Sequence, residues 1–524
     1  MGINNSTLAL IKYILDKKKV SIKNASMHFN KNESTIRREI ETINLHSRNK
    51  EIILIDNGIL TTSLNYTEYT EFIKSLSISQ YSSTPYERIN TILISALIND
   101  CVNLTSLYNE LGLSITTKKN DTKLLKTILE EKNLKLTVLK KKGIKIEGDE
   151  RIFRLLVIKQ LQLIMDVNID YKLERRKANT PFENHAFNLF IEKISSYNSI
   201  INEKLLYFIN NINVNISYLS RKFLVLYLSV SVFRQENAYP LNSITNVPIK
   251  VTNHRIFNSD LENQEFSNIV SILDTNPSQP FPFDEKLLKL SNIFVDNLLL
   301  DIKANIIKKD QFIKEIYYFM YKQISSHYLD VYFDDKTVNN VEIALPKIHK
   351  VISNNQIIFK DKYNIELNNI QVSTLSLIAK KWLNITASVK RKSLKIILVT
   401  NIVYERIQFF EELIKSYYDV TLVGVFTLYD IEKIKTIDYD FIILFSNRML
   451  SVIKEQFKNA IKVNFFLSDE DIKILNSCGF NPSKKRILAH DFIEDIKRLK
   501  SINEAILFKR LENHMKEKYT DYFL

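Results

Sequence analysis

The segment ITTKKNDTKLLKTILEEKNLKLTVLKKKGIKIEG, residues 115–148, decides the fold of the N-terminal third of the chain. In its first half, apolar residues recur at helical spacing, which predicts an amphipathic helix. The apolar face comprises Leu124, Leu125, Ile128 and Leu129, and the polar face comprises Thr116, Thr117, Lys118, Lys119 and Lys123. The second half predicts a β-hairpin, because two apolar runs flank a turn that contains Gly143. Lys140, Lys141 and Lys142 lie near the tip of this hairpin.

Two further helices are expected immediately before this segment. PYERINTILISALIND (residues 85–100) is amphipathic and begins with a proline, and LTSLYNELGL (residues 104–113) predicts a short helix with Gly112 in the following turn. The order helix, short helix, helix, hairpin is that of a winged helix-turn-helix. In such a unit the third helix lies in the major groove of DNA.

The N-terminus of the chain repeats this order. A helix is expected from Leu8 to Leu15, and SIKNASMHFN (residues 21–30) predicts a short second helix. The third helix is ESTIRREIETINL (residues 33–45), and EIILIDNGILTTS (residues 51–63) predicts a hairpin around an Asp-Asn-Gly turn. The polar face of the third helix carries Ser34, Thr35, Arg37 and Arg38, which are residue types that contact phosphates and base edges. Each polar face alone could be an ordinary solvated surface, but two consecutive copies favour DNA binding.

The charge distribution is consistent with a polyanionic partner. The chain has a net charge of +14, and residues 1–160 carry 25 Lys and Arg against 17 Asp and Glu, which gives +8. This segment is under a third of the 524 residues and holds over half of the excess. DNA, RNA and an anionic membrane surface would all suit such a segment, and a lysine-rich composition without a partner is the alternative.

Several classes of protein are disfavoured by composition. The seven glycines are scattered, so no nucleotide-binding loop is present, and two cysteines cannot form a multi-cysteine metal site or a disulfide scaffold. A membrane span needs about 20 consecutive apolar residues, and the sequence contains no such run. We therefore expect a cytoplasmic protein that is not an enzyme, has no catalytic residues, and needs no metal or cofactor.

The second hairpin and the helix after it resemble the second helix-turn-helix of Mga-like and BglG-type bacterial regulators. The resemblance is carried by Lys142, Gly143, Gly148, Glu150 and Arg154. It implies a mainly α chain with a C-terminal α/β domain. The expected segments are winged helix-turn-helix units at residues 1–66 and 80–165, helical phosphotransferase-system (PTS) regulation domains at 166–280 and 281–391, a domain like PTS enzyme IIB at 392–490, and a helical tail at 491–524.

The regulation domains of this family accept phosphate on histidines, and these positions are altered here. In YLSRKFLVLYLSVSVFRQENAYPL (residues 218–241), Tyr227 and Tyr239 stand where the resemblance implies histidines, while Arg234 is retained. Phe319 stands at the corresponding position of the second domain, where His327 and His349 are possible displaced phospho-acceptors. A phenol is a poor substitute for an imidazole in phosphotransfer.

The C-terminal region alternates strands and helices, which predicts βαβ units and a parallel sheet. Its first strand, LKIILVT (residues 394–400), ends at Thr400, where an enzyme IIB domain carries a phosphorylated cysteine. Residues 401–405 contain no glycine. We therefore expect a degenerate module that serves assembly or sensing.

Together these features predict a DNA-binding transcription regulator of the Mga-like virulence type that acts as an activator. Its expected partners are double-stranded DNA, a second copy bound through the helical and IIB-like domains, and PTS proteins, without a membrane. The alternatives are a BglG-type RNA-binding antiterminator, an enzyme of the PTS, and a structural or sensor protein with vestigial DNA-binding units.

Overall fold

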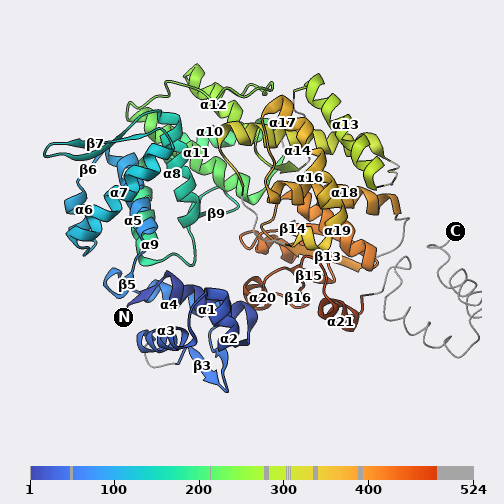
Figure 1. Ribbon diagram of the computed structural model, residues 1–524, viewed down its shortest axis with the longest axis horizontal. Coiled ribbons are helices and arrows are strands. Elements are labelled where there is room, and N and C mark those ends of the chain that lie inside the picture. Colours follow the sequence, from blue (N-terminus) through green and yellow to red (C-terminus); the bar gives the residue numbers. More distant parts are fainter. Residues whose placement is uncertain are drawn as a thin grey trace, which may run out of the picture.

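A computed structural model describes residues 2–480 except 48–50, 213, 277–281, 303, 305, 307, 334–339 and 388–393. Helices dominate this part of the chain, and a parallel sheet lies toward its C-terminal end (Figure 1). The predicted fold class, a mainly α protein with a C-terminal α/β region, is confirmed. The expected C-terminal tail at 491–524 lies outside the described residues.

The N-terminal helices and hairpin have the expected order, with one short strand in addition. We call residues 5–62 the first unit: α1 (Asn5–Lys17), β2 (Val20–Ser21), α2 (Ile22–Phe29), α3 (Glu33–His46), β3 (Ile53–Asp56) and β4 (Ile59–Thr62). Strand β2 pairs antiparallel with β4, which makes a three-stranded sheet in the order β2-β4-β3. The core of this unit includes the buried Ile36, Ile40 and Ile43 of α3.

The same arrangement recurs in residues 85–147, which we call the second unit. It comprises α5 (Pro85–Asn99), β6 (Cys101–Val102), α6 (Leu104–Glu110), α7 (Ile115–Glu131), β7 (Lys135–Leu139) and β8 (Gly143–Glu147). The sheet order is β6-β8-β7, so the short strand between the first two helices again pairs with the last strand. Leu125 and Leu129 of α7 are buried, whereas Leu124 and Ile128 are half-buried.

The two units are joined by a short connection. It contains α4 (Tyr66–Ser75), a 3-10 turn η1 (Ile78–Gln80) and β5 (Tyr81–Ser82). Strand β1 (Ile3–Asn4) pairs parallel with β5, so the start of the chain is hydrogen-bonded to the strand that leads into the second unit. Both units share one apolar core with the helices that follow them.

The middle of the chain forms two helical groups. The first contains α8 (Glu150–Ile164), β9 (Met165–Val167), β10 (Leu173–Arg175), α9 (Pro181–Ile194), the 3-10 turn η2 (Ser195–Tyr197), α10 (Asn198–Ile212), β11 (Asn215–Ile216), α11 (Tyr218–Glu236), α12 (Asp260–Val270) and β12 (Thr275–Asn276). The second contains α13 (Glu285–Ile302), α14 (Lys309–Leu329), α15 (Val341–Ala344), α16 (Pro346–Asn355), α17 (Ile357–Tyr363) and α18 (Asn369–Ala387), with its own core.

One long connection in the first group is not helical. Residues 237–259 form neither helix nor strand, and polar side chains of α12 form hydrogen bonds with several of their backbone groups. Asn263 Oδ1 accepts hydrogen bonds from the backbone N–H groups of Ile256 and Phe257, and Glu265 accepts one from Thr245. These side chains take the place of the backbone partners that a helix or sheet would provide, so the segment is held in position without secondary structure.

The C-terminal sheet has four strands in the order β14-β13-β15-β16, and all of them are parallel. Its elements are β13 (Leu394–Val399), α19 (Tyr404–Tyr417), β14 (Val420–Phe426), the 3-10 helix η3 (Ile431–Thr436), β15 (Phe441–Leu444), α20 (Asn447–Lys454), β16 (Ala460–Lys462) and α21 (Asp469–Ser477). Apolar clusters cover both faces of this sheet, as expected where helices pack on each side.

Candidate DNA-binding surface

Helix α7 presents a basic polar face at its N-terminal end. Ser114 Oγ caps the helix by accepting the Thr117 N–H at 3.1 Å. Thr116, Lys119 and Lys123 are exposed, while Thr117 and Lys118 are half-buried. Lys118 Nζ donates to Thr105 Oγ1 of α6 at 2.9 Å, which fixes its position across the turn between the two helices. All five side chains predicted for this face therefore reach solvent.

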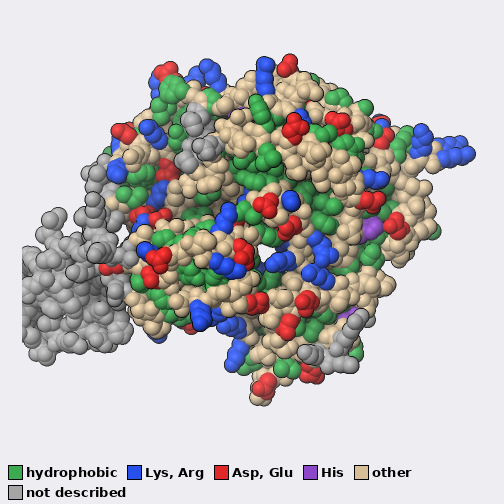
Figure 2. Space-filling view, turned by 180° about the vertical axis from the view of Figure 1, so that it is seen from behind, with side chains coloured by type: hydrophobic (Ala, Val, Ile, Leu, Met, Phe, Trp, Pro, Cys, Tyr) green, Lys and Arg blue, Asp and Glu red, His purple; other side chains and the backbone are tan. Residues whose placement is uncertain are grey.

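The β7–β8 hairpin projects from the edge of the molecule (Figure 1), and blue basic side chains gather at the matching projection seen from behind (Figure 2). The basic residues at its tip, Lys140, Lys141 and Lys142, are all exposed. Gly143 has a φ of +111°, and a Cβ there would lie 2.1 Å from the carbonyl oxygen of Val102. The hairpin can thus cross β6 closely only because this residue is glycine.

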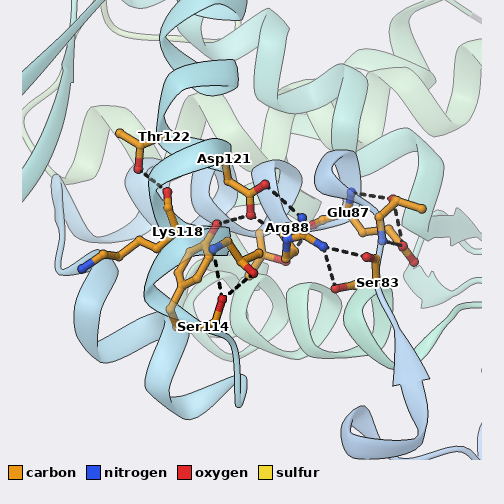
Figure 3. Close-up of polar contacts among 11 residues, drawn as sticks. Ser83, Glu87, Arg88, Ser114, Lys118, Asp121 and Thr122 are labelled. Atoms are coloured by element: carbon orange, nitrogen blue, oxygen red, sulfur yellow. Dashed lines mark hydrogen bonds and ion pairs between the residues drawn. The ribbon is translucent and has the colours of Figure 1, made fainter. Parts of the chain in front are cut away.

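A buried ion pair holds the inner side of α7. Arg88 of α5 donates from Nε and Nη2 to the carboxylate of Asp121 at 2.6 and 2.9 Å. Tyr108 of α6 donates to the same carboxylate at 2.7 Å, so all three helices of the unit meet at one side chain. Figure 3 shows Asp121 and Arg88 pointing toward each other, whereas Lys118 extends away from them.

Burial lowers the pKa of Arg88, but the hydrogen bonds and charge of Asp121 outweigh it, so the net shift is upward. The pKa of Tyr108 is also raised, first by burial and then by Asp121. The triad therefore keeps Arg88 charged and Tyr108 protonated. These residues were not among the sequence predictions, although Asp121 lies four residues before Leu125 and thus on the buried face.

The first unit presents a different surface. Ser34, Thr35, Arg37 and Arg38 of α3 are exposed, as are the acidic Glu33 and Glu41. In its hairpin, the apolar side chains of Leu54, Ile55 and Ile59 are 44%, 39% and 43% exposed. The hairpins of the two units point in different directions (Figure 1).

The residues that follow the second hairpin lead into a second buried charge cluster. Arg234 of α11 donates to both oxygens of Glu150 at 2.7 Å, and Arg154 donates to Glu150 at 3.0 Å and to Glu262 at 2.9 Å. Burial raises the pKa of Glu262, and the charge of Arg154 opposes this shift. The retained Arg234 thus connects α11 to the helix that follows the second unit.

The positions expected to be degenerate phosphate acceptors are poorly accessible. Tyr227, Phe319 and Thr400 are 2%, 3% and 5% exposed, and burial raises the pKa of Tyr227 well above its usual value. Tyr239 is half-buried, with its ring centroid 3.7 Å from the guanidinium carbon of Arg234.

The two histidines considered as displaced acceptors differ in exposure. His327 is half-buried, with Nδ1 3.5 Å from the Tyr332 hydroxyl. His349 is 8% exposed, and its Nε2 has no hydrogen-bond partner among the described residues.

The loop after β13 is occupied by side chains from elsewhere in the chain. The Tyr404 N–H at the start of α19 donates to Asp274 Oδ2 at 3.1 Å. Lys322 of α14 donates to Asp274 at 2.9 Å and to Glu405 at 2.6 Å. The Asp274 carboxylate therefore lies at the N-terminus of α19, a position that favours negative charge.

Comparison with known families assigns a class to the second unit. Residues 65–159 match the Mga helix-turn-helix domain, and this range includes α5, α6, α7 and the β7–β8 hairpin. The chain therefore carries a helix-turn-helix domain of DNA-binding transcription regulators. A comparison with curated proteins gives no match.

The described residues provide neither a metal-binding cluster nor a membrane-spanning helix. The described part of the chain contains no cluster of three or more His, Cys, Asp or Glu side chains that could hold a metal ion. Among the same residues, no helix is long and apolar enough to cross a bilayer.

Proposed function

We propose that this protein regulates transcription by binding duplex DNA through the second unit. The N-terminal half of α7 enters the major groove, and Lys140, Lys141 and Lys142 of the hairpin contact the phosphate backbone. The observation that carries the proposal is the two-sided character of α7. Its outer face is polar and basic, while Asp121 fixes its inner face to α5 and α6. The first unit contributes through Ser34, Thr35, Arg37 and Arg38.

The remaining domains are proposed to regulate this activity without phosphotransfer. In this proposal the two helical groups correspond to PTS regulation domains, the parallel sheet corresponds to an IIB domain, and both support a homodimer. Tyr227, Phe319 and Thr400 are buried and carry neither an imidazole nor a thiol to accept phosphate. The protein would act in the cytoplasm as an activator of the Mga-like virulence type.

Binding to duplex DNA, to hairpin RNA and to a neutral polymer across a salt series tests the proposal. We expect duplex binding whose logarithm falls linearly with the logarithm of salt concentration. The double variant Lys118→Gln/Lys119→Gln should bind more weakly, and its slope should be smaller by roughly 0.9 for each phosphate that is no longer neutralised. The control Lys314→Gln/Lys350→Gln removes the same charge from exposed positions of α14 and α16. Equal behaviour of the two double variants would show that α7 does not face DNA, and preferential RNA binding would favour antitermination.

The regulatory part of the proposal has a separate test. Reporter activity should be unchanged when the general phosphotransfer proteins are deleted, because the expected acceptor positions carry no imidazole or thiol. Phosphate found on His327 or His349 would contradict this expectation if replacement of that histidine also altered activity. The measurement is phosphorylation by the phosphorylated carrier protein in parallel with the reporter assay.

A further inference from the structure

A cavity of about 370 Å³ lies where the first helical group meets the C-terminal sheet. Its wall is formed by the segment after β9, the start of α11, the loop after β13 and the loop after β14. Ligands of parallel sheets bind at the carboxyl ends of the strands, where the loops after β13 and β14 lie. The volume falls in the range of small-molecule sites, roughly 300–1,000 Å³.

A buried arginine in the cavity wall lacks a full set of partners. Arg221 is 8% exposed, and its Nε has no hydrogen-bond partner among the described residues. Arg221 forms an ion pair with Asp430, but the Nη2–Oδ2 distance of 3.9 Å is beyond hydrogen-bond distance. The ring centroids of Tyr171 and Tyr218 lie 5.6 and 5.8 Å from the guanidinium carbon of Arg221. The charge of Arg221 thus has a partner, whereas its Nε–H group is left to donate a hydrogen bond to an added anion that accepts several.

The start of α11 adds a second feature suited to an anion. Ser217 precedes this 19-residue helix, and its side chain makes no capping hydrogen bond. Its Oγ is buried and has no partner among the described residues, and it lines the same cavity. The N–H groups of a first helical turn and the helix dipole both favour negative charge. Arg221 lies one turn further along the same helix, so both groups flank one position.

The loop after β14 adds a hydrogen-bond acceptor to the cavity wall. Asp430 Oδ2 accepts a hydrogen bond from Thr427 Oγ1 at 2.7 Å, whereas its Oδ1 is buried without a partner in the described chain. A free carboxylate oxygen calls for a donor such as a hydroxyl group. Lys433 lies at the rim of the cavity and is exposed, so it adds positive charge at the entrance.

We propose that this cavity binds a small hydroxylated organic phosphate of about the size of a sugar phosphate. The phosphoryl group lies between Ser217, Arg221 and the first turn of α11, and a hydroxyl group of the same molecule donates to Asp430. Phosphate fits better than carboxylate because it offers enough oxygens for the guanidinium, the serine and the backbone at once. The rings of Tyr171 and Tyr218 provide flat surfaces for the carbon skeleton.

The site is connected to the DNA-binding part through β9. This strand follows α8 directly, and α8 lies largely within the matched residues 65–159. Asp166 of β9 accepts hydrogen bonds from Lys222 at 3.1 Å and from Tyr429 at 2.7 Å, and these donors lie on α11 and on the loop after β14, two elements that border the cavity. A ligand that draws α11 and the β14 loop together therefore acts on the segment that leaves the second unit. This effect on DNA rests on the proposed function, whereas ligand binding does not.

Calorimetric titration of the full chain with glucose 6-phosphate, inorganic phosphate and glucose tests the site. We expect glucose 6-phosphate to bind most tightly, inorganic phosphate more weakly, and glucose least. Arg221→Gln should weaken glucose 6-phosphate binding at least about tenfold, as the loss of one charge-assisted hydrogen bond predicts. Ser217→Ala should weaken it by a smaller factor, and Lys435→Gln, on the exposed side of η3, should leave it unchanged.

Two results would overturn the site. One is the absence of binding by both phosphates at millimolar concentration, and the other is glucose binding as tightly as glucose 6-phosphate. If Arg221→Gln does not fold, as judged by circular dichroism, Ser217→Ala and Asp430→Asn decide the question, and unchanged affinity in both would also overturn it. Duplex binding measured with and without glucose 6-phosphate separates the two proposals. Absence of duplex binding both with and without glucose 6-phosphate contradicts only the proposed function, and a ligand that leaves DNA affinity unchanged contradicts only the coupling.

Discussion

Helices α3 and α7 occupy the same place in their units, yet they carry opposite net charges. Helix α3 has two arginines against three glutamates, and α7 has four lysines against one aspartate and two glutamates, so the balances are −1 and +1. The hairpins differ more strongly. Residues 51–63 contain two acids and no Lys or Arg, whereas residues 134–148 contain five lysines and one glutamate before the next helix begins. In the third helix and the hairpin, the second unit therefore carries more positive charge than the first, which favours contact with a phosphate backbone at these elements.

The units also differ in how their third helix is held. Counted from the capping residue, the seventh position is Glu39 in α3 and Asp121 in α7. Glu39 pairs with Lys31, whose side chain is 23% exposed, while Asp121 is 2% exposed and receives two hydrogen bonds from Arg88. The same position thus bears a half-buried pair in one unit and a buried pair in the other. Buried pairs are costly to break because one charge is left unpaired.

The largest expected effect is the loss of this buried pair. Asp121→Ala should lower the free energy of unfolding by about 3–5 kcal/mol, because Arg88 is left buried without its partner. Glu39→Ala should cost no more than about 1 kcal/mol, since its pair is partly solvated. Urea denaturation of the two variants measures the difference. The double variant Arg88→Met/Asp121→Leu should recover much of the loss, and similar losses in Glu39→Ala and Asp121→Ala would contradict the comparison.

The hairpin glycines give a second, smaller contrast. Gly143→Ala should destabilise the protein by about 3 kcal/mol, because the added Cβ meets the Val102 carbonyl and the backbone has positive φ. Gly58 of the first hairpin also has positive φ (+77°), but nothing lies within 4 Å of an added Cβ. Gly58→Ala should therefore cost only about 1 kcal/mol. Thermal unfolding measures both, and an equal cost would show that the β6–β8 crossing relaxes easily.

Neutralising the hairpin tip tests the charge difference itself. Lys140→Gln/Lys141→Gln/Lys142→Gln should weaken duplex binding and reduce the salt slope by roughly 0.9 for each phosphate that the lysines had neutralised. Arg37→Gln/Arg38→Gln should have a smaller effect, because the acidic Glu33, Glu39 and Glu41 already offset the charge of α3. Fluorescence anisotropy with labelled duplex at several salt concentrations measures both slopes. A larger change in the arginine variant would make the first unit the main DNA-binding element.

The smallest effect concerns an ion pair between the first unit and the C-terminal sheet. Arg448 of α20 lies 2.9 Å from Asp16 of α1, and Asn447 donates to the Asp16 carbonyl at 2.6 Å. Since both charged side chains are about a third exposed, Arg448→Gln should cost at most about 1 kcal/mol. Hydrogen exchange should become faster in α1 and stay unchanged in α7. Equal acceleration in both helices would mean that the units open together.

The carboxyl group of this ion pair also titrates differently in the folded chain. Burial raises the pKa of Asp16, and the charge of Arg448 opposes this shift. Its folded-state pKa is thus above the unfolded value, so its contribution to stability is present at low pH and declines as pH rises through the folded pKa.

The sequence by itself determined the elements whose signals are local. Helical spacing located α3 and α7, the Asp-Asn-Gly turn located the first hairpin, and the strand–helix alternation located the parallel sheet, because each pattern depends on neighbours within one or two turns. The exposure of Lys140, Lys141 and Lys142 also followed from their position at a turn. The assignments of the PTS-like domains and of individual DNA-binding residues stay predictions.

Only the tertiary structure decided which polar residues are buried and what they meet. Asp121 pairs with a residue 33 positions away, and Arg234 pairs with one 84 positions away, so no window of sequence contains both partners. The cavity beside Arg221 is assembled from segments that begin at Ile169 and end at Lys433. The energy of a buried charge depends on every group packed around it, and the chain brings those groups together only by folding.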